Sequence, residues 1–227
     1  MVHDSRLAWR VGTGLLGAIA LLVAGCASNS TPPESSAGPV SAGSAKVDTA
    51  AATLRQTLDS LLQENVVLVA DTTDAALAGR TEEFAAAKDA LDQNSQDLAD
   101  TMGEVYGKDT RESFLNLWSK HLGYLMDYTQ GVAAKDQARQ DTAINNLVTY
   151  CDDFGSFCDS LTEGRLKRDS MAELFKTHIK GLKDIIDAQD AKDFATAYSR
   201  ERDAEKQMFV IGNALAGAIA DQYSDKF

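Results

Sequence analysis

The chain has 227 residues and carries 34 acidic against 22 basic side chains, a formal net charge of −12. Binding a polyanion requires a clustered positive surface, so this balance argues against nucleic acid as a partner. No proline follows Pro39. The rest of the chain therefore lacks this helix breaker and is long enough for one domain with a substantial core.

Residues 1–26 have the parts of an export signal. Arg6 and Arg10 form a short positive region, and Val11–Ala24 is an apolar run shorter than the roughly 20 residues of a membrane-spanning helix. The following LVAGC resembles a bacterial lipobox, which implies cleavage before Cys26 and attachment of a diacylglycerol to its sulfur. The resemblance predicts a lipoprotein held on the extracytoplasmic face of the cell membrane.

The segment 27–52 is rich in Ser, Ala, Gly and Pro and has almost no large apolar side chain. Such a segment cannot bury enough surface to offset its chain entropy, so it is predicted to be a disordered tether. Residues 53–227 remain as the folded domain.

One pattern occurs three times in this domain. RQTLDSLLQEN begins at Arg55, RESFLNLWSKH at Arg111 and RDSMAELFKTH at Arg168, so the copies lie 56 and 57 residues apart. Each has Leu six residues after the Arg and Asn or His ten residues after it. A repeat of this length indicates tandem copies of one supersecondary unit.

Each repeat is long enough for two helices joined by a short turn. The apolar spacing predicts helices at 53–78 and 81–105, 110–133 and 136–162, and 167–189 and 192–224. The fold class is therefore all-α, a bundle or array of three tandem αα-hairpins with repeats at about 53–106, 109–163 and 166–225. Leu61, Leu117 and Leu174 are predicted to be buried, and the run Gly212–Ala220 is predicted to let the last helix approach a neighbour closely.

The usual catalytic signatures are missing from the sequence. It contains no HExxH, CxxCH, GxSxG or glycine-rich phosphate loop. A ferritin-like di-iron site needs Glu three residues before His, but Trp118 and Phe175 occupy those positions before His121 and His178. We therefore expect no enzymatic activity and no di-iron centre.

The repeat places polar residues on the predicted inner stripe at Asn65, His121 and His178. Thirty residues later come Ser95, Cys151 and Met208, and each pair is centred on a predicted turn. Antiparallel helices would bring His121 opposite Cys151 and His178 opposite Met208. Imidazole and soft sulfur ligands suit copper, especially Cu(I), so these four residues are the candidate metal ligands.

Ordinary core packing is the alternative for the same four side chains, because His, Cys and Met all occur in cores. Cys151 and Cys158 lie two helical turns apart, about 10.5 Å, which is too far for a disulfide between them. The repeated Asp71, Asp127 and Asp184 are predicted on a helix flank, paired with the repeat arginines or facing water.

Two functions are compatible with these features. The first is a non-enzymatic, membrane-anchored binding module, with copper as its candidate ligand. The second is a structural, interaction or sensor-like helical domain that docks a protein partner in the envelope without any metal.

Overall fold

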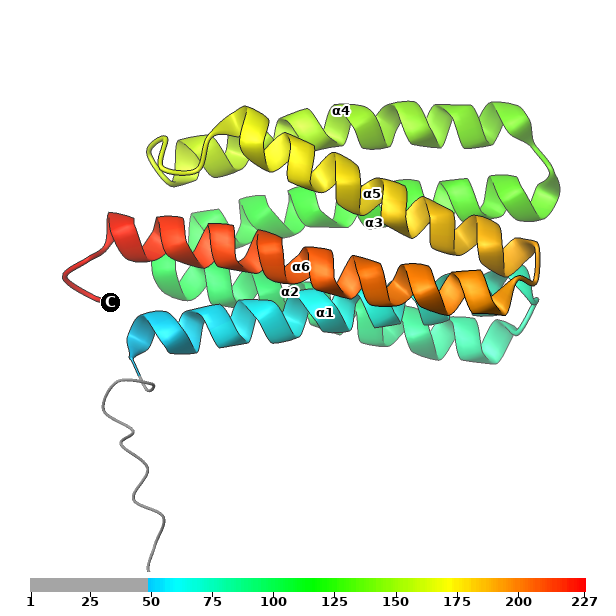
Figure 1. The fold of residues 1–227 in the computed structure, drawn as a ribbon, viewed down its shortest axis with the longest axis horizontal. Helices are drawn as coiled ribbons and strands as arrows, with labels where there is room; N and C mark the ends of the chain where they lie inside the picture. The colour runs from blue at the N-terminus through cyan, green and yellow to red at the C-terminus, as the bar shows by residue number, and fades with distance from the viewer. Residues whose placement is uncertain (1–48) are drawn as a thin grey trace, which may run out of the picture. The chain divides into compact units, whose positions relative to one another are not determined.

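The computed structural model describes residues 49–227, and these residues form six helices and no strand (Figure 1). The predicted signal peptide, Cys26 and most of the predicted tether lie outside the described residues. Helix boundaries agree with the predicted ones to within three residues. The helices are α1 (Ala50–Leu77), α2 (Thr81–Tyr106), α3 (Lys108–Ala134), α4 (Gln137–Leu161), α5 (Arg168–Asp190) and α6 (Phe194–Gln222).

The six helices form three αα-hairpins, α1–α2, α3–α4 and α5–α6, as predicted. Each helix packs against the next in the chain, and α6 returns to pack against α1, so the bundle is a closed ring. The first helices of the hairpins, α1, α3 and α5, also contact one another. They are the inner helices, while α2, α4 and α6 are the outer ones. None of the described helices is long and apolar enough to cross a membrane.

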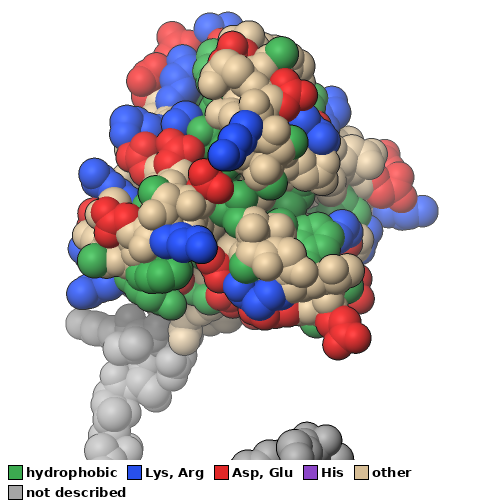
Figure 2. Space-filling model, turned by 90° about the vertical axis from the view of Figure 1, so that its right-hand side faces the viewer, with side chains coloured by type: hydrophobic (Ala, Val, Ile, Leu, Met, Phe, Trp, Pro, Cys, Tyr) green, Lys and Arg blue, Asp and Glu red, His purple; other side chains and the backbone are tan. Residues whose placement is uncertain are grey.

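The three hairpin turns lie at one end of the bundle, the end that Figure 2 views face-on, and they repeat the same backbone geometry. Gly79, Lys135 and Lys192 all have positive φ, at 68°, 54° and 57°. The next residue in each turn donates its N–H to a carbonyl five residues back, as in Arg80 to Ala75 at 2.9 Å. This bond satisfies a carbonyl at the helix end, in the manner of a Schellman motif. Lys135 and Lys192 bear the steric cost that Gly79 avoids.

The most buried side chains of α1, α3 and α5 are those that directly follow the three leucines predicted to be buried. Leu61, Leu117 and Leu174 are only partly buried, whereas the next residues, Leu62, Trp118 and Phe175, are at most 3% exposed. The inner helices contact one another as well as their hairpin partners. The most buried side of each inner helix therefore faces the middle of the ring. The apolar pattern within a single hairpin carries no information about the contacts between inner helices.

Glycine allows two outer helices to approach the next inner helix closely. A Cβ on Gly155 would clash with the backbone and side chain of α5, and one on Gly212 would clash with the Asp59 carboxylate on α1. These glycines are equivalent in the repeat. The predicted close approach of the last helix is therefore confirmed at Gly212, where it closes the ring.

Candidate functional site

Two of the polar repeat positions, Asn65 and His121, contact residues that lie 29 positions later in the chain. Asn65 donates from Nδ2 to Asn94 Oδ1 at 3.0 Å, and the His121 ring lies 5.1 Å from the Tyr150 ring. His178 lines a surface pocket together with Gln207. The expected pairs, His121 with Cys151 and His178 with Met208, stay predictions. A contact between residues 29 positions apart is centred between two turn residues. The expected pairs, 30 positions apart, are centred on the second of these two residues.

We call the six residues Asn65, Asn94, His121, Tyr150, His178 and Gln207 the histidine layer. His121 Nδ1 lies 2.5 Å from the carbonyl oxygen of Trp118. A carbonyl can only accept, so Nδ1 carries the proton and Nε2 presents an unprotonated lone pair. His121 Nε2 is buried and has no hydrogen-bond partner among the described residues.

Several other polar atoms in and beside this layer are also buried without a partner in the described part of the chain. Both ring nitrogens of His178 are among them, as are the Tyr150 hydroxyl and the Trp118 indole nitrogen. Phe175 lies beside both histidines, with ring centroids 6.4 Å from His121 and 5.8 Å from His178. The layer therefore combines aromatic rings with buried polar groups that lack hydrogen-bond partners. Such groups lower the stability of the folded state.

Burial keeps both histidines neutral. Loss of solvation lowers the pKa of His121 to about 3, against a smaller opposing effect of the Trp118 carbonyl. Loss of solvation also lowers the pKa of His178 to about 3, and the nearby His121 adds to the decrease. Neutral imidazole is the form that binds metal ions.

The two predicted sulfur ligands are buried as well. Cys151 and Met208 are fully inaccessible to solvent, and burial raises the pKa of the Cys151 thiol to about 11. Residues 49–227 contain no group of three or more His, Cys, Asp or Glu side chains that could hold a metal ion. His121, Cys151 and His178 therefore do not assemble into the predicted four-ligand cluster with Met208. Cys151 and Cys158 are both free thiols, as their spacing predicted.

The repeated aspartates lie on helix flanks, but their partners differ from the predicted ones. Asp127 pairs with Arg139 at 2.7 Å, and Asp184 pairs with Lys180 at 2.7 Å. In each repeat the arginine lies 16 residues before the aspartate on the same helix, which separates the two residues by about 24 Å at 1.5 Å per residue. That distance rules out the predicted pairing.

The sequence-based reasoning missed the outer face of α6, defined here as Phe194, Tyr198, Phe209 and Val210. These four are among the few large apolar side chains exposed in the described residues, and Tyr198 is the most exposed at 68%. An alignment of the three outer helices, residue by residue, would have revealed this face.

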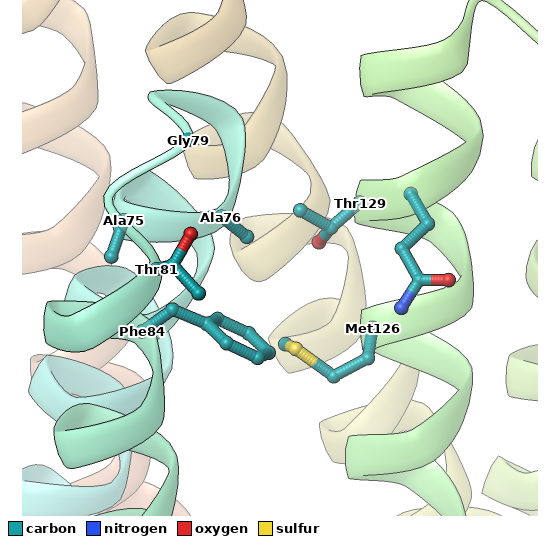
Figure 3. Close-up of a pocket in the computed structure, with 8 residues that line it drawn as sticks. Ala75, Ala76, Gly79, Thr81, Phe84, Met126 and Thr129 are labelled. Carbon is teal, nitrogen blue, oxygen red and sulfur yellow. The ribbon is translucent and has the colours of Figure 1, made fainter.

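It also missed a pocket between the first hairpin and α3, which we call the α2–α3 pocket. Phe84 from α2 and Met126 from α3 point toward each other across it, with Thr81, Thr129 and two alanines around them (Figure 3). Its volume is about 230 Å³. The complete lining is Ala75, Ala76, Gly79, Thr81, Phe84, Met126, Thr129 and Gln130.

Comparison with known proteins returned no match to a family model, to a curated protein or to a solved structure.

Proposed function

We propose that this protein is a lipid-anchored, extracytoplasmic and non-enzymatic interaction module that docks a protein partner of the envelope through the outer face of α6. The lipobox-like LVAGC before Cys26 supports the anchor. The chemistry of α6 supports the docking.

The observation that carries this proposal is a contrast among the three outer helices. Phe194 and Tyr198 of α6 correspond to Thr81 and Ala85 in α2 and to Gln137 and Asp141 in α4. Phe209 and Val210 correspond to Gln96 and Asp97 in α2 and to Asp152 and Asp153 in α4. At these four positions the scaffold thus exposes polar or small residues twice and large apolar residues once. Concentrated exposed apolar area is typical of protein interaction sites.

Site-specific photo-crosslinking in cells tests this docking. A benzophenone amino acid replaces Tyr198 in one variant and Asp141, its counterpart on α4, in the control. We expect a discrete crosslinked protein from position 198 that is absent from position 141, and its loss when Phe209→Asp is added. Equal yields at the two positions, or no product at position 198, would contradict the proposal.

The anchor has its own test. Cys26→Ala should abolish lipidation and change how the chain fractionates with membranes, because the modified sulfur is removed. A variant that matures and fractionates like the parent would show that LVAGC does not direct lipidation.

A second candidate function is binding of Cu(I) at the histidine layer. It is supported by one specific observation, the buried and unpartnered nitrogens of His121 and His178, because imidazole is a good copper ligand. The pocket beside His178 is also lined by Asp184 and Asp203, which would attract a cation on its way in.

Titration with Cu(I) against a chromophoric chelator separates the two donor sets. If sulfur takes part, Cys151→Ser should weaken binding more than Met208→Leu, since thiolate is the stronger donor. If the imidazoles alone bind the ion, both sulfur variants should bind like the parent while His178→Phe loses binding. No binding by the parent would leave only the docking function.

A further inference from the structure

The α2–α3 pocket lies where the ring has three equivalent seams between an outer helix and the next inner helix. The seams are α2–α3, α4–α5 and α6–α1. Because the hairpins share one geometry, corresponding positions can be compared directly, and the other two seams act as internal references for the first.

One position in the pocket lining differs in size among the three hairpins. Ala76 lines the α2–α3 pocket, and its counterparts are Val132 in the second hairpin and Gln189 in the third. Gln189 is buried and joins α5 to α1 beside the α6–α1 seam. It donates to the Ala70 carbonyl at 2.8 Å and accepts from the Thr73 hydroxyl at 2.8 Å. Ala76 has only a methyl group, which is too short to cross the α2–α3 pocket as the Gln189 side chain crosses to α1.

The walls facing each other across the seam also differ. The counterparts of Phe84 and Met126 at the α4–α5 seam are Gln140 and Lys183. Gln140 donates to the Gly131 carbonyl at 3.2 Å, and Lys183 pairs with Asp187 at 2.5 Å and lies over the Tyr128 ring. Both positions of that seam thus hold polar side chains that are bonded to neighbours. Phe84 and Met126 form no such bonds and leave an apolar gap.

The rim of the pocket still has hydrogen-bonding capacity. The Thr129 hydroxyl donates to the Leu125 carbonyl, so its oxygen can accept another bond. Arg139 donates to Gln130 Oε1, which leaves the amide nitrogen of Gln130 as a donor. One acceptor and one donor beside an apolar wall match a ligand with a single hydroxyl group.

We propose that the α2–α3 pocket binds a small aromatic molecule that carries one hydroxyl group, with the ring against Phe84 and Met126 and the hydroxyl at Thr129 and Gln130. An aromatic ring gains favourable contacts with both Phe and Met sulfur. A pocket of about 230 Å³ is ample, since apolar cavities of about 150 Å³ bind benzene. This site lies apart from the outer face of α6 and is independent of the docking function.

The test is a titration with p-cresol, followed by NMR of ¹³C-labelled methionine methyl groups. Residues 49–227 are used because their six helices pack into one closed ring. Met126 is partly exposed in the pocket, whereas Met102, Met171 and Met208 are at most 1% exposed. We expect a saturable shift of the Met126 signal, little change in the other three, and binding at least about threefold weaker for toluene, which lacks the hydroxyl.

Variants that copy the other hairpins provide the decisive comparison. Ala76→Gln and Ala76→Val, the residues found at the equivalent positions, should fill the space and weaken p-cresol binding at least tenfold. Ala90→Gln, at an exposed position of α2 outside the pocket lining, should bind like the parent. If Ala76→Gln does not fold, the p-cresol affinity of Ala76→Val, which carries the smaller substitution, provides the same comparison. Unchanged affinity in a folded Ala76 variant, equal shifts at all four methionines, or no saturable Met126 shift would overturn the proposal.

Discussion

Lowering the pH from 7 to 5 is expected to destabilise the folded domain through its two buried histidines. His121 and His178 are the only histidines in residues 49–227, so no other side chain of this type titrates there. Their folded-state pKa values, about 3 for each, lie below the unfolded value of roughly 6.5. Stability is therefore fully present above pH 6.5 and falls as the unfolded chain takes up protons that the folded state excludes.

The size of the effect follows from proton linkage. At pH 5 an unfolded histidine is almost fully protonated while the buried one stays neutral, which costs about 2 kcal/mol per histidine relative to pH 7. Both imidazoles are neutral in the folded state at pH 5, so repulsion between them does not enter. The two together should reduce the free energy of unfolding by about 4 kcal/mol, a large part of the stability of a typical domain.

Urea unfolding of the parent and of His178→Phe at pH 7 and pH 5 measures this effect. The variant should lose about 2 kcal/mol of the pH dependence. Carboxyls whose pKa burial raises, such as Glu201, oppose the trend because they favour folding at lower pH, but they are common to both proteins and cancel in the comparison. An identical pH dependence in the two proteins would mean that His178 is protonated or hydrated in the folded state.

Three further predictions concern packing and thiol chemistry. Leu62→Ala should cost about 2 to 5 kcal/mol in chemical unfolding, and Leu61→Ala clearly less, because only the first side chain is fully buried; equal losses would contradict the core described here. Gly155→Ala should destabilise by about 1 to 3 kcal/mol because its methyl group meets the backbone of α5, while Gly217→Ala, which has open space around it, should be neutral or stabilising by up to about 1 kcal/mol; the two melting temperatures test this contrast. Cys151 should react with a thiol reagent only after unfolding, since burial hides it and raises its pKa to about 11; rapid alkylation of the native protein would refute this.

The repeat and the short turns made the three hairpins predictable from the sequence. Each helix pair is a local unit, and its boundaries depend on nearby residues. The facing partner of His121 was not predictable to the same precision. The spacing drew attention to Cys151, whereas the ring that lies 5.1 Å from the His121 ring belongs to the preceding residue, Tyr150, so the aromatic side of the site was not anticipated.

The arrangement of the hairpins around the ring could not be predicted either, because each hairpin contains the same kind of apolar stripe. The α2–α3 pocket shows the consequence. Its existence depends on Ala76 lying at a seam, which becomes apparent only when the neighbour of each outer helix is known. The exposed apolar residues of α6, by contrast, were open to prediction by comparing outer helices with one another.

Closure of the ring between α6 and α1 brings the beginning and the end of the described chain together. Ala50 and Thr53 line the same pocket as Lys226 and Phe227, at one end of the bundle. The fold therefore has no intrinsic first hairpin. A circularly permuted chain, with Phe227 joined to Thr49 by a short linker and new termini at Gly107, should therefore retain all three seams, because the packing does not depend on which hairpin comes first.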